Sequence, residues 1–182
     1  MKKRKGMIRM TVSIKQFDVQ SRGKTPTYID VTEEVKQAIA ESGIQNGTVT
    51  VISPHTTCAV FFEEFSHDMN ENGDELLQQD LNDVLEKIIP NHDSAETYLY
   101  PGEEHYQAVE SWPNAAEYLP GGDRSALWNG DAHLKATILG SSEVFSVEDG
   151  ALGVGKTGYI YFADFDRTRA RTRKCKVVVM GE

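Results

Sequence analysis

The sequence predicts a single α+β domain over residues 1–182, with mixed or antiparallel sheets, two main helices and a C-terminal β-meander. Strand-like and helix-like segments come in blocks rather than in regular alternation, which argues against a parallel βαβ fold. The 182 residues suffice for a substantial core, and 39% hydrophobic with 26% charged residues is ordinary for a globular protein. These observations predict one compact unit.

The N-terminal third is expected to hold three strands and one helix. Apolar residues alternate over 10–19, and their phase changes near 15–16, which predicts a strand with a bulge. An acidic residue three positions before a glutamate is typical of a capping box and predicts a helix over 30–41. Two further apolar runs predict strands over 47–53 and 57–62.

The clearest helix is predicted over residues 72–89, and Pro90 ends it. Asp80 falls within its apolar arc on a helical wheel, so this short carboxylate is either a site residue or a buried partner of a neighbouring loop. We expect that arc to face the core: Leu76, Leu77, Leu81, Val84, Leu85, Ile88 and Ile89.

Residues 91–130 show no sustained periodicity and are predicted to form a long irregular loop. Five aromatic residues between Tyr98 and Tyr118 favour an ordered functional loop or lid over disorder. A short helix is expected next, over 132–139. Alternating segments after it predict the C-terminal meander: 143–147, 159–165 and 176–180.

Charge and composition restrict the classes of function. A net charge of −9 argues against a nucleic-acid or membrane-surface binder. No apolar run approaches the roughly 18 residues that a membrane span requires, and two cysteines are too few for a disulfide framework. We therefore expect a cytoplasmic protein without nucleic-acid or membrane partners.

Residues 150–157, GALGVGKT, match the phosphate-binding pattern of P-loop nucleotide hydrolases. That loop needs a helix after the lysine and threonine, so that backbone N–H groups point at the phosphates. Here the alternating segment GYIYFAD follows and predicts a strand. A nucleotide hydrolase is therefore only the third hypothesis for this chain.

Candidate site residues lie in three other segments. In PHTTCAVFFEE, His55 precedes a strand and Glu64 ends it, where Glu64 is either a buried carboxylate or a solvated one. His105 lies in the long loop, and Asp131, His133 and Lys135 follow at the start of a helix. Imidazole and carboxylate together suit a zinc or manganese ion, whereas carboxylates with phosphate suit magnesium.

Alternate arginines follow the last acidic pair in DFDRTRARTRK, where Arg169 is one of four. On a strand they would share one face suited to phosphate, although basic side chains also protect edge strands from aberrant pairing.

Taken in order, these motifs resemble the YjbQ family, often described as secondary thiamine-phosphate synthases. The resemblance extends from about residue 10 to the C-terminus and implies a compact α+β fold, a homotrimer and a polar, metal-binding pocket. The implied activity joins a pyrimidine diphosphate to a thiazole phosphate, with pyrophosphate leaving. Matching positions are His55, Glu64, Asp74, Asp80, His105, His133, Lys135 and Arg169.

The chain also departs from the family pattern. Asp131 stands where the first histidine of an H-x-H pair is usual, and the sequence GKTG at 155–158 replaces G-T-W-Q. Asp164 replaces a glutamate, and the segments 64–74 and 91–131 are longer than usual. The lost tryptophan would alter the shape and stacking of a pocket wall.

We therefore expect a metal-assisted enzyme acting on small phosphorylated metabolites, with thiamine-phosphate synthesis as a secondary activity. His105, His133 and Asp131 would hold a divalent ion (zinc, or magnesium or manganese). His55 would be a further ligand of that ion or act as acid or base, and Glu64 and Asp80 would orient water or the metal ligands. Lys135 and Arg169 would bind phosphate. The alternative is a non-catalytic trimeric protein that binds a metal or an anionic metabolite.

Overall fold

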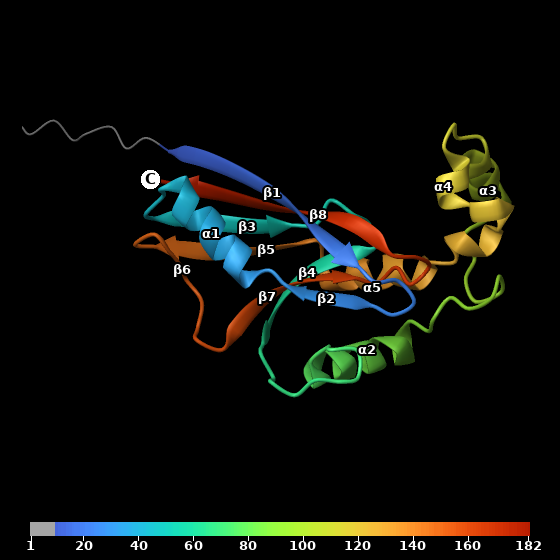
Figure 1. The fold of residues 1–182 in the computed structure, drawn as a ribbon, viewed down its shortest axis with the longest axis horizontal. Coiled ribbons are helices and arrows are strands. Elements are labelled where there is room, and N and C mark those ends of the chain that lie inside the picture. Colours follow the sequence, from blue (N-terminus) through green and yellow to red (C-terminus); the bar gives the residue numbers. More distant parts are fainter. Residues whose placement is uncertain (1–9) are drawn as a thin grey trace, which may run out of the picture.

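The computed structural model describes residues 10–182 and has two sheets, in which every strand pair is antiparallel (Figure 1). The larger sheet has the order β1-β8-β3-β5-β6 and the smaller one the order β2-β7-β4. The larger sheet comprises β1 (Thr11–Ser21), β8 (Arg171–Gly181), β3 (Gly47–Ile52), β5 (Ser142–Glu148) and β6 (Ala151–Leu152). The smaller sheet comprises β2 (Thr27–Asp30), β7 (Gly158–Asp164) and β4 (Cys58–Glu64). The predicted single α+β domain is confirmed.

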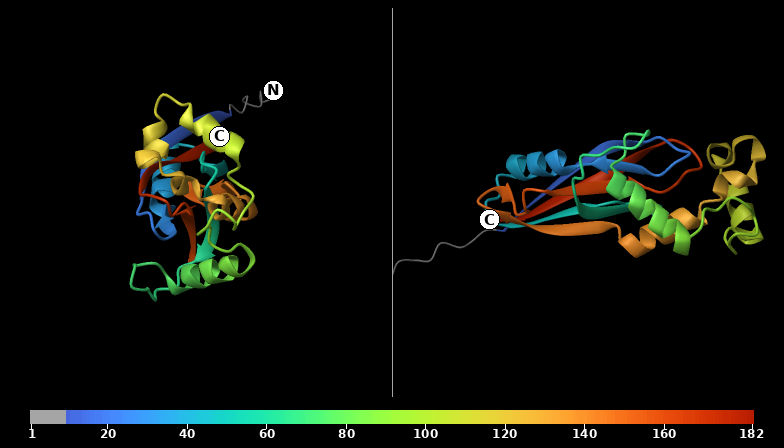
Figure 2. Two further views of the ribbon diagram at one scale, coloured as in Figure 1. Left: turned by 90° about the vertical axis from the view of Figure 1, so that its right-hand side faces the viewer. Right: turned by 90° about the horizontal axis from the view of Figure 1, so that it is seen from below.

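Helices cover both sheets and extend from one end of the molecule (Figure 2). The main ones are α1 (Thr32–Ser42), α2 (Leu76–Ile88) and α5 (Gly130–Leu139). One apolar cluster joins α1 to both sheets, for example through Val35, Val177 and Phe162. A second cluster joins the opposite face of the smaller sheet to α5 and α2 through Tyr161, Ala136 and Leu85. None of the helices in residues 10–182 is long and apolar enough to span a membrane.

Strand β1 has no bulge, which corrects the sequence prediction. Its residues pair one to one with β8 from Thr11 to Ser21. The change of phase has a different cause: Val12 and Ile14 point outward and are 55% and 68% exposed, whereas Val19 points into the core. The strand carries apolar residues on both faces, whereas the predicted bulge required all of them to lie on one face.

Helix α2 is rotated relative to the prediction. It buries Gln78, Asn82 and Leu85, while Val84 and Ile88 are exposed. Asp80 is consequently exposed, so its expected place on a buried face is wrong. The predicted apolar residues do lie together on one side of the helix. The side that faces the domain, however, carries the amide side chains of Gln79 and Asn82, which line a polar cavity.

Residues 91–130 form helices rather than an irregular loop. They contain α3 (Glu103–Glu110), the single turn α4 (Ala115–Tyr118) and two short 3₁₀ turns, Pro120–Gly122 and Arg124–Leu127. Val109, Leu119 and Leu127 form a small core of their own. This helical segment lies at the end of the molecule beyond α5 (Figure 1). Its apolar positions are too few and too scattered to give a sustained helical period.

The C-terminal strands do not form the predicted meander. Only β5 and β6 form a hairpin, while β7 pairs with β2 and β4, and β8 lies between β1 and β3. The strand positions were predictable from alternation, but their partners are distant in sequence. Local pattern carries no information about such pairing.

Candidate functional site

A cavity of about 320 Å³ opens where the start of β4, the start of β8 and α5 meet the helical segment. Its walls combine three imidazoles, two guanidinium groups, one carboxylate, one amide and three large aromatic rings. They come from His55, Tyr100, His105, Trp112, Tyr118, Asn129, His133, Asp166, Arg171 and Arg173. Four segments distant in sequence thus contribute to one site, which we call the histidine cavity.

Two of the histidines lie against one tyrosine ring. The Tyr100 ring centroid is 5.0 Å from that of His105 and 5.5 Å from that of His133. The Tyr100 hydroxyl lies 3.2 Å from Nε2 of His105. Both imidazoles therefore pack against the Tyr100 ring at the cavity wall.

Burial lowers the pKa of two of the cavity histidines, His133 and His55. It lowers the pKa of His133, against opposing effects from Asp166 and from a hydrogen bond to the Thr56 carbonyl. Burial and then Arg173 also lower the pKa of His55.

His55 has one defined tautomer. Its Nε2 accepts a hydrogen bond of 2.8 Å from the backbone N–H of Lys174. A neutral imidazole that accepts at Nε2 carries its proton on Nδ1. His55 is therefore a hydrogen-bond donor, and it does not offer a free lone pair to a metal.

The two arginines of β8 are each held by a buried carboxylate. Arg173 donates to Asp164 from Nε at 2.7 Å and from Nη2 at 3.1 Å, and Arg171 donates to Asp166 from Nη2 at 2.7 Å. Burial opposes ionisation of Asp166, but Arg171 and Thr168 lower its pKa below the ordinary value. The edge-strand interpretation of the arginine stripe is wrong, because β8 pairs with β1 on one side and β3 on the other. Arg171 and Arg173 instead line the cavity, where acidic neighbours partly neutralise them.

Two buried atoms of the cavity residues have no hydrogen-bond partner in the part of the chain that the structure describes. They are Oδ1 of Asn129, an acceptor, and Nε of Arg171, a donor. Unpaired buried polar groups cost about 1–3 kcal/mol each. A ligand with an anionic oxygen and a hydrogen-bond donor would satisfy both.

The remaining predicted site residues lie outside this cavity. Glu64 is exposed at the opposite end of β4 from His55, in a separate hollow with Lys156 and Thr157. The solvated alternative for Glu64 is therefore the one the structure shows. Arg169 lies at the edge of the cavity, where it donates to the Tyr118 carbonyl at 3.1 Å and packs over that ring.

Asp131 does not join His133, which corrects the expected placement. Residues two apart on a helix point about 200° away from each other. The buried Asp131 carboxylate lies 3.4 Å from Nη2 of Arg167, and Lys135, 1% exposed, has its ammonium 3.8 Å from Glu86. Asp131 and Lys135 thus belong to a polar cluster beneath α2.

The P-loop hypothesis fails on geometry. Lys156 and Thr157 lie in the turn between β6 and β7, and strand β7 begins at the next residue, Gly158. No helix N-terminus follows to orient backbone N–H groups toward phosphate.

Sequence reasoning did not assign Tyr100, Asn129 or Asp166 to the site. The sequence indicated Arg171 and Arg173 only as two of four alternate arginines, without a specific role. Asp166 had a usable signal, because an acid that directly precedes a run of four alternate arginines is a natural ion-pair partner. Tyr100 had none, since its place between two histidines arises from the fold of residues 91–130.

Comparisons with known proteins agree with this architecture. The family model described as UPF0047 protein YjbQ-like matches residues 15–182. The UPF0047 protein YugU of Bacillus subtilis is 29% identical over 158 residues, covering 87% of this chain and 92% of its own. A UPF0047 protein of Methanothermobacter thermautotrophicus is 30% identical over 154 residues, covering 85% and 82%.

Solved structures match along most of the chain. A YjbQ/UPF0047 family protein of Clostridium acetobutylicum gives a TM-score of 0.64 at 27% identity, covering 90% of this chain and 98% of its own. A YbjQ-like protein of unknown function from Sulfolobus solfataricus gives 0.63 at 25% identity, covering 96% and 100%. The chain therefore belongs to the UPF0047/YjbQ-like family.

Proposed function

We propose that this chain is an enzyme that binds a small phosphorylated metabolite in the histidine cavity and transfers a group from it. The observation that carries the proposal is the unpartnered Nε of Arg171, which lies in one cavity with three histidines. A buried guanidinium donor without a protein partner is suited to an anionic oxygen. Tyr100, Trp112 and Tyr118 supply flat apolar surfaces for a ring.

The specific reaction we propose is the formation of thiamine phosphate. In it the C–O bond between a pyrimidine methylene carbon and diphosphate breaks, and the diphosphate leaves with the electron pair. The thiazole nitrogen forms the new C–N bond. Donors that face the departing oxygens lower the barrier, and Nε of Arg171 and Nδ1–H of His55 are the available donors of the cavity.

The reaction is tested with purified full-length protein. Incubation with the pyrimidine diphosphate and the thiazole phosphate should yield thiamine phosphate and diphosphate in equal amounts, measured by chromatography. A protein that binds thiamine phosphate but releases no diphosphate would be the non-catalytic binder instead. A protein that neither binds nor forms thiamine phosphate would contradict the proposal.

We also propose that a divalent ion takes part, held by His105 and His133. Imidazole nitrogens suit zinc and manganese, and a bound ion would neutralise charge on phosphate oxygens. Within residues 10–182, no group of three or more histidine, cysteine or acidic side chains is placed to hold a metal. Two imidazoles alone would need further ligands from the phosphorylated molecule or from water.

Metal dependence is measurable by calorimetry. Zinc or manganese should tighten the binding of thiamine phosphate to the wild-type protein, and His133→Asn should abolish that effect. His67→Asn is the matched control, because His67 is exposed and has a positive φ of 65° that asparagine tolerates. Equal metal effects in both variants would exclude His133 as a ligand. The homotrimer implied by the family resemblance stays a prediction.

A further inference from the structure

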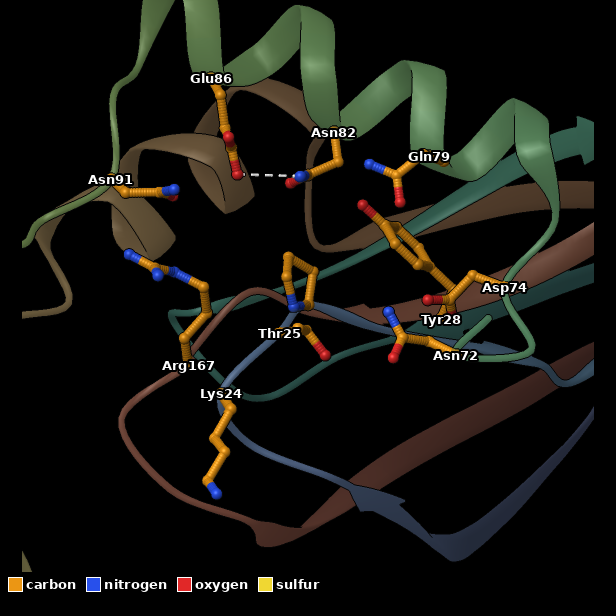
Figure 3. Close-up of a pocket in the computed structure, with 11 residues that line it drawn as sticks. Lys24, Thr25, Tyr28, Asn72, Asp74, Gln79, Asn82, Glu86, Asn91 and Arg167 are labelled. Carbon is orange, nitrogen blue, oxygen red and sulfur yellow. Dashed lines mark hydrogen bonds between the residues drawn. The ribbon is translucent and has the colours of Figure 1, made fainter. Parts of the chain in front are cut away.

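A second polar cavity lies beneath α2, separate from the histidine cavity. It has a volume of about 170 Å³ and is bounded by α2, β2 and the loops that carry Asn91 and Arg167. Figure 3 shows Gln79 directed from α2 toward Tyr28, Asn82 and Glu86 directed toward each other, and Asn91 and Arg167 at the Glu86 end. We call it the α2 cavity, and it shares no lining residue with the histidine cavity.

Three buried polar atoms of the α2 cavity have no hydrogen-bond partner among the residues that the structure describes. They are Oη of Tyr28, Oδ1 of Asn91 and Nε of Arg167. Each such atom costs about as much as a lost hydrogen bond. Three around one small space indicate a ligand that supplies both donors and acceptors.

Several other polar groups of this cavity have partners. Asn82 donates to Glu86 at 2.9 Å, and Gln79 donates to Asp83 at 2.7 Å. Asp74 forms an ion pair with Arg22. The three unpaired buried atoms therefore lie beside groups that are hydrogen-bonded or ion-paired, and each needs an explanation.

The charges around the α2 cavity are balanced. Lys24 and Arg167 are positive, and Asp74 and Glu86 are negative. Their neighbours keep the balance, because Arg167 also pairs with Asp131 and Asp93, Asp74 with Arg22, and Glu86 with Lys135. A dianion such as phosphate would face two carboxylates in addition to the cations. A molecule with one positive and one negative group fits both signs.

The two charges are also separated within the cavity. The Arg167 guanidinium lies at the end with Asn91, whereas Asp74 lies beside Tyr28 at the other end (Figure 3). Burial, with Asp74, Glu63 and Glu86, raises the pKa of Tyr28, so its hydroxyl stays neutral in a field that favours a cation. The volume limits such a molecule to a few heavy atoms beyond its charged groups.

We propose that the α2 cavity binds a small amino acid as its zwitterion, with the carboxylate on Nε of Arg167 and the ammonium facing Tyr28 and Asp74. The hydroxyl of Tyr28 accepts from the ammonium, and Oδ1 of Asn91, at the Arg167 end, accepts from a side-chain donor such as the serine hydroxyl. This site is independent of the chemistry proposed for the histidine cavity.

The test uses calorimetry on the full chain with glycine, L-alanine and L-serine as separate probes. Acetate has only the carboxylate and methylamine only the ammonium. Each should therefore bind at least tenfold more weakly than the best amino acid. Binding of none of the three amino acids would overturn the proposal. Tighter binding of inorganic phosphate, lost in Arg167→Gln, would also overturn it in favour of a simple anion site.

Tyr28→Phe is the decisive variant, because the hydroxyl it removes has no protein partner. The variant should fold normally and bind the amino acid about tenfold more weakly, as expected for a hydrogen bond to a charged group. Tyr159→Phe is the matched control, since Tyr159 lies in a different hollow. Unchanged binding in Tyr28→Phe would contradict the assignment. His133→Asn should retain amino-acid binding, which separates this site from the histidine cavity.

Discussion

Replacing Arg173 by methionine should lower the free energy of unfolding by about 3–5 kcal/mol. Arg173 is 8% exposed and Asp164 is 1% exposed, and two hydrogen bonds join them. Methionine would leave the Asp164 carboxylate buried without its counter-ion. Arg173 also donates to Thr57 at 2.9 Å, so the substitution removes a third buried contact.

Urea unfolding at fixed protein concentration measures this effect as a shift of the transition midpoint. Lys15→Met is the matched control, because Lys15 pairs with Glu41 at the surface and exposed pairs contribute about 0–1 kcal/mol. The double variant Arg173→Met with Asp164→Leu should recover part of the loss, since it removes both charges. Equal midpoints for Arg173→Met and Lys15→Met would refute this account of the pair.

Replacing Arg171 by glutamine should lower kcat for thiamine-phosphate formation by about 10²–10³-fold, the usual effect of losing one donor to a developing charge. The expectation rests on the proposed function and on the buried, unpartnered Nε of Arg171. Because charge on the diphosphate grows as the C–O bond breaks, the loss should fall mainly on kcat. Product formation at saturating substrate measures it.

Arg171→Lys should restore little of this activity, because an ammonium cannot both pair with Asp166 and direct a second donor into the cavity. Lys36→Gln also removes one positive charge, but on the exposed face of α1, and should leave kcat unchanged. Circular dichroism would check that Arg171→Gln keeps its fold. Wild-type turnover in a folded Arg171→Gln would exclude Arg171 from the reaction.

Much of the secondary structure could be predicted, because alternation and capping are local properties. The helix at Thr32–Ser42 and the strands β3, β4, β5 and β7 lie where the pattern indicates. The prediction failed where the local hydrophobic pattern does not determine which face of a helix is buried. The apolar stripe of α2 predicts a buried face, yet Val84 and Ile88 are exposed, because the domain turns amides toward a polar cavity.

The candidate site was predictable only in part. His55, His105 and His133 were identifiable as residue types capable of chemistry, and they do line one cavity. Asp131 shows the limit, since its proximity in sequence to His133 suggested a shared site. The helical turn separates the two, and the carboxylate lies with Arg167.

By itself the sequence determined the fold class, the family and the failure of the P-loop pattern, because each depends on residues that are close together along the chain. Only the tertiary structure decided which side chains share a cavity. Tyr100 meets His133, and Tyr28 and Arg167 line opposite ends of one cavity, because the fold brings together segments far apart in sequence. Such contacts depend on how helices and strands pack against one another. The local hydrophobic periodicity of the sequence does not determine how an element is rotated or which elements lie next to it.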